Sequence, residues 1–261
     1  IDIVKKYKKH IVCEKPMALR LEDADEMIQV CDEYGVRLFV VKQNRYNLPV
    51  VKTREALEQG RFGKIVLGTV RVRWSRDQNY YNQDSWRGTW SLDGGVISNQ
   101  ASHHIDLLEW MLGEPVSVMA MNGTYLVDIE ADDTCAALIR FKNGAIGIVE
   151  ATTAVRPKDL EGSLSIIGEK GSVVIGGFAV NKLETWNFTD ESESERETLL
   201  KEFTEIPPNV YGFGHFRYIE HIIDCIENNK KALVDGLEGR KSLELINALY
   251  ESAETGKEVA L

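Results

Sequence analysis

The segment around His103 carries the residue types of a general base. A Gly-Gly pair is followed by VISNQASHHIDLLEW. On a helix, Asn99, His103 and Asp106, spaced four and three apart, share one face. The opposite face carries an apolar stripe, which consists of Ile97, Ala101, Ile105, Leu108 and Leu112. A histidine with an amide one turn before it and a carboxylate one turn after it could accept a proton. A solvated helix face is the alternative, and for His104 solvation or packing is favoured.

Lys15 is the second residue with a possible chemical role. It stands between Glu14 and Pro16, directly after the apolar segment 10–13 (HIVC). A residue before proline is confined to extended geometry, so its side chain can be aimed into a crevice. Ligands of open α/β sheets bind at the carboxyl ends of strands, and we expect Lys15 to lie at such an end. A surface lysine in a turn is the alternative.

Three further segments are candidates for binding. The loop 78–90 (QNYYNQDSWRGTW) is long and rich in Tyr, Trp and Asn, which is typical of loops that form the wall of a binding site. The alternative is a surface loop anchored by Trp86 and Trp90. Lys42 and Arg45 follow a second predicted strand and could hold a carboxylate or phosphate, with surface charge as the alternative. The glycines of segment 211–215 (YGFGH) could let the backbone approach a ligand closely. The alternative is that the segment simply leads into the helix that follows.

The elements that position these residues form two groups. At the start, segment 10–13 and the apolar run 36–41 read as strands around a helix at 21–34 that Gly35 ends. That order is a β-α-β unit with parallel strands. A helix at 48–59 and a strand at 65–74 follow.

Beyond residue 75 the pattern changes. A helix reaching Leu112 is followed by several strand candidates, and Asn143-Gly144 is a hairpin turn between two of them. The second region is therefore predicted to be mainly an antiparallel sheet. The stretch 191–198 (ESESERET) is expected to be a solvated loop or linker, and 216–228 and 240–254 are expected to be amphipathic helices.

The composition limits the classes of partner. A formal net charge of −10 over 261 residues argues against nucleic acid or an anionic membrane surface. No apolar run approaches a membrane span, and four scattered cysteines without a CxxC pair indicate reduced thiols and no metal site. We therefore expect a cytoplasmic protein.

A glycine-rich turn of the dinucleotide-binding type is absent. Such a turn joins the first strand and helix of that domain, but Gly168, Gly171, Gly176 and Gly177 lie far downstream among strand-like residues and read as hairpin turns. If the β-α-β unit is the second half of a Rossmann domain, its phosphate-binding half precedes residue 1. We expect a fragment that binds cofactor weakly or not at all.

Three motifs in order resemble the Gfo/Idh/MocA oxidoreductases: Glu-Lys-Pro after a strand, a Gly-Gly turn before a helix, and a histidine three residues ahead of Asp106. VVKQNRYN, WRGTW, NQASHHIDLLEW, LEGSLSIIGEKGSV and VYGFGH are similar to the subgroup that oxidises the 3-hydroxyl of UDP-2-acetamido-2-deoxyglucuronate (UDP-GlcNAcA). Most superfamily members have Asp four residues before the catalytic histidine. Asn99 stands there in this chain, as in the UDP-sugar acid subgroup.

The resemblance implies a role for each matching residue. Lys15 and His103 are the catalytic pair, in which His103 takes the hydroxyl proton and Lys15 polarises the oxygen. The implied substrate-binding residues are Asn99, Gln100, Arg45, Tyr81, Tyr211 and His215. The implied residues on the side of the NAD cofactor are Glu14, Pro16, Trp86 and Arg87. No metal is implied.

The resemblance also implies a fold and an assembly. Residues 1–46 are the remnant of an NAD-binding Rossmann domain, and residues 47–261 are an α+β substrate-binding and oligomerisation domain with C-terminal helices. The large sheet makes homodimers or homotetramers in this superfamily. The product, a 3-keto sugar nucleotide, feeds surface polysaccharide biosynthesis, and some members recycle NADH with 2-oxoglutarate. A non-catalytic sugar-nucleotide-binding protein, or another sugar or inositol dehydrogenase of the superfamily, are the alternatives.

Overall fold

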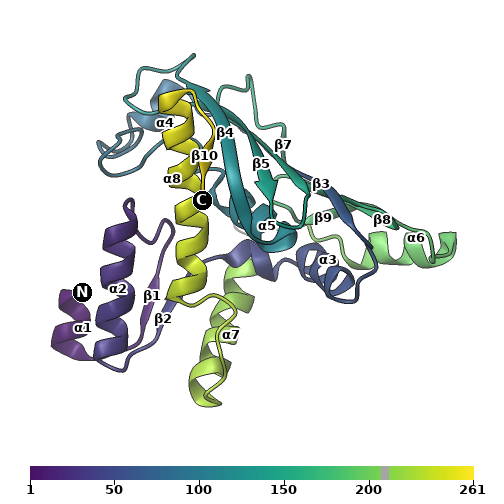
Figure 1. Ribbon diagram of the computed structural model, residues 1–261, viewed down its shortest axis with the longest axis horizontal. Helices are drawn as coiled ribbons and strands as arrows, with labels where there is room; N and C mark the ends of the chain where they lie inside the picture. Colours follow the sequence, from purple (N-terminus) through teal and green to yellow (C-terminus); the bar gives the residue numbers. More distant parts are fainter. Residues whose placement is uncertain (207–211) are drawn as a thin grey trace.

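The computed structural model describes residues 1–206 and 212–261 and places them in a small parallel sheet and a large, mainly antiparallel one, with helices around both (Figure 1). The helices are α1 Asp2–Tyr7, α2 Leu21–Glu33, the 3-10 turn η1 Gln43–Tyr46, α3 Leu48–Glu58, α4 Gln78–Tyr81, α5 Ser102–Leu112, α6 Glu193–Glu202, α7 Gly214–Glu227 and α8 Gly236–Thr255. The strands are β1 Ile11–Cys13, β2 Leu38–Val40, β3 Ile65–Arg73, β4 Pro115–Gly123, β5 Thr134–Phe141, β6 Ile146–Thr152, β7 Glu161–Gly168, β8 Gly171–Gly176, β9 Lys182–Phe188 and β10 Val259–Ala260. This arrangement confirms the predicted fold class.

The small sheet pairs β1 and β2 in parallel, with Ile11 opposite Leu38. Helix α2 connects the strands and ends at Gly35, whose φ of 61° is the left-handed conformation that glycine adopts most easily. The β-α-β unit and its helix end are therefore as predicted. Its core also takes Val234 and Leu243 from the C-terminal part of the chain, because α8 packs against α2 and β2.

The large sheet has eight strands within the described residues, in the order β10-β4-β5-β6-β3-β7-β8-β9. Every neighbouring pair is antiparallel except β3 and β6. Asn143 and Gly144 turn the chain between β5 and β6 as predicted, with Gly144 at a φ of 88°. Burial alternates along β5, so one face of the sheet lies against the core and the other faces outward. Among the described residues, no helix has the length and apolar character needed to cross a bilayer.

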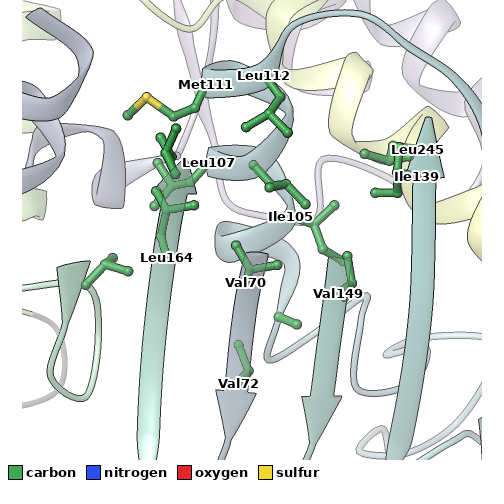
Figure 2. Packing of buried hydrophobic residues seen from close by; sticks show 14 of the residues in the cluster. Val70, Val72, Ile105, Leu107, Met111, Leu112, Ile139, Val149, Leu164 and Leu245 are labelled. Carbon is green, nitrogen blue, oxygen red and sulfur yellow. The ribbon is translucent and has the colours of Figure 1, made fainter. Parts of the chain in front are cut away.

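Helix α5 lies across the inner face of the large sheet. Figure 2 shows Ile105 and Leu112 of this helix above Val70 of β3 and Val149 of β6. Two glycines permit the close approach: a Cβ added at Gly68 would lie 2.6 Å from Leu112. At Gly147, paired with Gly68 in the parallel ladder, an added Cβ would lie 2.7 Å from Phe141 and 3.3 Å from Leu108. Full burial of each such leucine contributes roughly 1.5–3 kcal/mol, so the sheet holds α5 firmly.

Two sequence-based predictions about helices were wrong. Segment 191–198 is not a loop: α6 begins at Glu193, and Ser192 and Glu195 form a reciprocal capping box that satisfies two backbone N–H groups. Helix α5 begins only at Ser102, so Asn99 lies in the turns before it. Those turns follow Gly95, where an added Cβ would lie 1.9 Å from a carboxylate oxygen of Asp132.

Candidate active site

Lys15 projects from the carboxyl end of β1 toward the start of α5. Its Nζ donates to the backbone oxygen of Asn99 at 2.7 Å and to the Asn99 Oδ1 at 3.3 Å. Burial, followed by the nearby charge of Lys42, lowers the pKa of Lys15 to about 8. The sequence motifs that contain Lys15 and Asn99, 84 residues apart, are thus brought into contact as expected.

His103 lies in the first turn of α5, and its side chain is part-buried, with the Nδ1 atom hidden from solvent. Burial first, and then the charges of Lys15 and Lys42, hold the pKa of His103 well below its ordinary value of 6.5. The ring is therefore neutral near pH 7 and has a lone pair available. The Gln43 amide nitrogen lies 3.0 Å from His103 Nε2, and because an amide nitrogen only donates, Nε2 is the accepting atom.

We call Lys15, Gln43, Asn99 and His103 the reactive corner. Within the described residues, two of its atoms are buried without a hydrogen-bond partner, His103 Nδ1 and Gln43 Oε1. Buried polar atoms normally have partners, and exceptions concentrate at functional sites. A neutral imidazole can accept the proton of a hydroxyl, and a nearby cation can stabilise the alkoxide that develops.

Asp93 connects the corner to the aromatic loop. It accepts a hydrogen bond from the Asn99 side chain and another, at 2.7 Å, from the backbone N–H of Gly88. The Arg87 guanidinium stacks on Trp86 at 4.6 Å, and Arg87 and Lys15 both act on the Asp93 carboxylate electrostatically. The Trp86-Arg87 pair thus lies on the side of the corner where Lys15 and Asn99 meet.

One turn further along α5, Asp106 belongs to a separate group of buried charges. Arg45 donates to both Asp106 carboxylate oxygens at 2.8 Å, and also to Glu238 at 3.0 Å. Lys42 Nζ lies 3.6 Å from Asp106 and donates to Ser242 Oγ at 2.6 Å. We call Lys42, Arg45, Asp106 and Glu238 the ion cluster. It joins the segment after β2 to α5 and α8.

The ion cluster corrects two sequence-based roles. Arg45, predicted to bind substrate, is 2% exposed and directs its guanidinium at two carboxylates of the protein itself. Asp106, predicted to tune His103 from the same helix face, is instead paired with Arg45 and Lys42. Burial alone would raise the pKa of Asp106, but these two cations hold it below its ordinary value.

Glu109 is a buried carboxyl beside the ion cluster. Burial, followed by the negative charge of Asp106, raises the pKa of Glu109 to about 8. Its Oε2 has no hydrogen-bond partner among the described residues. Glu109 is therefore mainly protonated at pH 7, and the four charges of the ion cluster balance without it.

The other predicted site residues lie in varied places. Gln100 is buried, Glu14 is exposed with its carboxylate 3.3 Å from the Lys15 backbone nitrogen, and Lys15-Pro16 is a cis peptide. His215 is near enough to His103 to affect the pKa of that ring. Tyr211 lies outside the described residues.

Tyr81 does not match its predicted role as a substrate ligand. The ring is 5% exposed, and its hydroxyl lies 3.0 Å from Thr153 Oγ1. Burial raises the pKa of Tyr81 to about 12. The side chain therefore anchors the loop 78–90 to the sheet. His104, expected to be solvated or packed, is buried and packs edge-on against Trp74 at 6.0 Å.

The sequence analysis did not single out two residues of the site, Gln43 and Asp93. Gln43 belongs to the KQNRY segment, in which only the cations drew attention, and its contact with His103 spans 60 residues. Asp93 immediately precedes the Gly-Gly pair, so the turn itself was the available signal. Within the described residues, no group of three or more His, Cys, Asp or Glu side chains is placed to hold a metal ion.

Comparison with known proteins yields family matches over most of the chain. Residues 54–261 match the C-terminal alpha/beta domain of the Gfo/Idh/MocA oxidoreductase family, and residues 1–42 match its NAD-binding Rossmann fold. Myo-inositol 2-dehydrogenase of Thermotoga maritima is 30% identical over 98% of this chain and 74% of its own length. Levoglucosan dehydrogenase of Pseudarthrobacter phenanthrenivorans is 28% identical over 79% of this chain and 58% of its own length.

Solved structures of higher identity also match. The WlbA dehydrogenase from Bordetella pertussis, in complex with NADH and UDP-GlcNAcA, is 45% identical with a TM-score of 0.90, over 97% of this chain and 72% of that one. The WlbA dehydrogenase from Chromobacterium violaceum, with the same ligands, is 42% identical with a TM-score of 0.88, over 97% and 70%. Because two domains of the family are matched in order over residues 1–42 and 54–261, the chain belongs to the Gfo/Idh/MocA family of NAD-dependent oxidoreductases.

Proposed function

We propose that this protein oxidises the 3-hydroxyl of a UDP-linked 2-acetamido-2-deoxyglucuronate to the 3-keto sugar nucleotide. The observation that carries the proposal is the reactive corner, in which the part-buried Lys15 ammonium is held by Asn99 close to the start of α5, where the His103 imidazole is kept neutral. The two WlbA structures support the choice of substrate, because both were determined with UDP-GlcNAcA and share 42–45% of their residues with this chain.

In this reaction His103 accepts the proton of the 3-hydroxyl as the C3–H bond breaks and the C3=O bond forms. Bound NAD would supply the acceptor for the hydride that leaves C3 with its electron pair. The Lys15 ammonium stabilises negative charge on the oxygen, which favours loss of the proton. Asn99 fixes Lys15 through its two oxygen atoms, and Asp93 holds Asn99 in turn.

The residues present fit the nicotinamide end of NAD. Lys15 and Lys42 follow the carboxyl ends of the neighbouring parallel strands β1 and β2, which is the edge where open α/β sheets bind ligands. The unpartnered His103 Nδ1 and Gln43 Oε1 lie in the adjoining corner. We propose that Glu14, Pro16, Trp86 and Arg87 border this end. Gly35, the one glycine of residues 1–46, ends α2 and forms no phosphate-binding turn.

The substrate side of the proposal retains several residues. Asn99, Gln100 and His215 stay candidates for the sugar, as does Tyr211 from its sequence motif alone. The proposed pathway is biosynthesis of diaminouronic acids for surface polysaccharide. We also propose a cytoplasmic location, which the unpaired state of all four cysteines supports.

Calorimetric titration of this chain with UDP-GlcNAcA, and separately with NAD and with myo-inositol, tests the proposal. We expect the UDP-sugar to bind, NAD to bind weakly or not at all, and myo-inositol to give no heat. Tighter binding of myo-inositol than of the UDP-sugar would favour an inositol dehydrogenase. A folded protein that binds none of them would contradict the proposed substrate.

We further propose that the outer face of the large sheet forms a homo-oligomer. Met119, Met121 and Leu138 are 43%, 77% and 54% exposed, and Met119 and Leu138 are cross-strand partners. Contiguous exposed apolar surface of this kind is typical of an association interface. Light scattering should show a dimer or tetramer, and Leu138→Glu should give monomers. A monomeric parent would contradict this assembly.

A further inference from the structure

We propose that Asp93 is a positioning residue for the reaction, which acts through Asn99 to keep the Lys15 side chain charged and directed at the reacting oxygen. This inference rests on the proposed function, since it concerns how the same reactive corner holds its cation. Asp93 immediately precedes Gly94 and Gly95 and is 6% exposed, so its carboxylate meets protein groups and little solvent.

Both oxygens of the Asp93 carboxylate accept hydrogen bonds. Oδ1 accepts from Nδ2 of Asn99, and Oδ2 accepts from the backbone N–H of Gly88 at 2.7 Å. An ionised carboxylate has acceptors only, so two N–H donors suit its charged form. Burial raises the pKa of Asp93, while these two hydrogen bonds and the charges of Lys15 and Arg87 act against the rise. The surroundings of Asp93 therefore favour its negative charge.

The partners on its two sides fix which way the Asn99 amide faces. A carboxylate can only accept and an ammonium can only donate, so the amide nitrogen must face Asp93 and the amide oxygen must face Lys15. The structure has this orientation, with Oδ1 of Asn99 3.3 Å from Lys15 Nζ. A neutral amide at position 93 would let the Asn99 amide turn over and present its NH₂ group to the ammonium. Asp93 thus determines the side-chain acceptor that Lys15 meets.

The charges around Lys15 make this acceptor important. Lys42 follows the strand next to the one that Lys15 follows, and after burial its charge is the main cause that lowers the pKa of Lys15. The charges that oppose this effect are those of Asp93 and then Glu14. Glu14 is exposed, and solvent screens its charge. Asp93 is therefore the carboxylate best placed to keep the ammonium protonated.

Asp93→Asn tests the proposal, because it keeps the shape of the side chain and removes its charge. The readout is the pH dependence with which acetic anhydride acetylates Lys15 in the whole chain without ligand, quantified by peptide mass spectrometry against free phenylalanine. Only the neutral amine reacts, so the midpoint of the curve reports the pKa of Lys15. For the parent we expect a midpoint at about pH 8. In Asp93→Asn it should fall by about one pH unit, because a nearby opposite charge is lost.

Two further variants separate the electrostatic role from general damage. Asp84→Asn is the matched control, since it removes an exposed carboxylate of the same loop, which pairs with Arg87 at 3.0 Å, and it should keep the parent midpoint. Asp93→Glu keeps the charge and should keep the midpoint within about 0.5 pH unit of the parent, even if the longer side chain lowers the thermal stability.

A double-mutant cycle tests the route through Asn99. Asn99→Ala removes the amide that joins Asp93 to Lys15. In this background Asp93→Asn should move the midpoint by less than half as much as it does in the parent. Equal movement in the two backgrounds would mean that the charge of Asp93 acts on Lys15 directly, and it would overturn the positioning role.

The outcomes separate this inference from the proposed function. A midpoint that stays at the parent value in Asp93→Asn overturns the role of Asp93 and leaves the proposed function standing. A midpoint that rises toward about 10.4, the value of an exposed lysine, would show that Asp93 only maintains the local structure, and it also contradicts the inference. If the folded parent does not bind UDP-GlcNAcA, the proposed function fails, and the role of Asp93 in that reaction fails with it even where the midpoint moves as expected.

Discussion

The reactive corner and the ion cluster occupy successive turns of the same buried helix, yet they use burial in opposite ways. In the cluster, Asp106 is matched by Arg45 and Lys42, and its pKa stays low enough for full ionisation. In the corner, His103 is kept neutral and retains an unpartnered ring nitrogen. The same helix α5 therefore carries a neutral, unsatisfied group in its first turn and a compensated charge in its second.

The difference indicates that the ion cluster serves the stability of the fold, whereas the reactive corner is suited to chemistry. Buried charges persist only when they are paired and hydrogen-bonded, so the ion cluster can fix α5, α8 and the segment after β2 relative to one another. A neutral base needs a lone pair that is not tied to a charge, and in the corner the lone pair of His103 Nε2 meets one neutral donor, Gln43, while His103 Nδ1 and Gln43 Oε1 have no partner among the described residues. The cluster holds the corner in place at a distance of one helical turn.

Removing the central carboxylate should have the largest effect. Asp106→Ala leaves Arg45 and Lys42 buried without their shared partner, which should lower the free energy of unfolding by about 3–5 kcal/mol. Urea denaturation measures the change. Glu114→Gln, which breaks an exposed pair with Lys142, is the control and should cost less than about 1 kcal/mol. Equal losses in both variants would remove the distinction between the cluster and an ordinary surface pair.

Acid should weaken the first turn of α5 through its histidines. Burial lowers the pKa of His104 to about 4 from 6.5 in the unfolded chain, so between these values the unfolded state binds more protons and stability falls as pH falls. From pH 7 to 4.5 this group should contribute a loss of about 2–3 kcal/mol. His104→Phe, which can keep the edge-on contact with Trp74, should lose that much less over the same range. Parallel stability curves for parent and variant would contradict a neutral buried His104.

Glu109 should show the opposite pH dependence. Its pKa is raised to about 8, so the native state binds the extra proton between pH 4.5 and 8, and stability falls as pH rises through that window. Glu109→Gln removes the titration. The variant should gain about 3–4 kcal/mol relative to the parent between pH 5 and 8.5, measured by urea denaturation at each pH. A constant difference would mean that Glu109 is an ionised member of the ion cluster.

Replacing the proposed base should have the smallest effect on stability. His103→Leu removes a ring with an unpartnered nitrogen but also takes away the acceptor of the Gln43 amide, so the free energy of unfolding should change by no more than about 1 kcal/mol in either direction. Thermal denaturation measures this. A drop above about 2 kcal/mol would place His103 among the stabilising groups and break the comparison.

Local patterns were sufficient to predict much of the fold. The β-α-β unit, the Gly35 helix end and the Asn143-Gly144 hairpin follow from periodicity and turn chemistry over a few residues. Helix α6 was also accessible, because Ser192 and Glu195 have the spacing of a capping box, but the density of charge around them favoured a loop. The start of α5 could not be predicted in this way. The apolar spacing continues through residues 97–101, and nothing in the local sequence at Asn99 indicates that this stretch is not helical.

The site was predictable in its residue types and less so in its pairings. Lys15, Asn99 and His103 follow from motifs, but the partner of Asp106 is Arg45, 61 residues away, and not His103 on the neighbouring turn. Helical spacing shows which side chains share a face, and it does not show what another segment places against that face. For this reason the role predicted for Arg45 was wrong, and Gln43 was not singled out.

Gln43 and Arg45 lie two residues apart on η1, one facing His103 and the other paired within the ion cluster. Such an arrangement lets one position vary while its neighbour stays fixed. A change at 43 alters only an incompletely bonded amide, so it carries less risk of unfolding than a change at 45. The surroundings of His103 can therefore change in single steps on an unchanged frame.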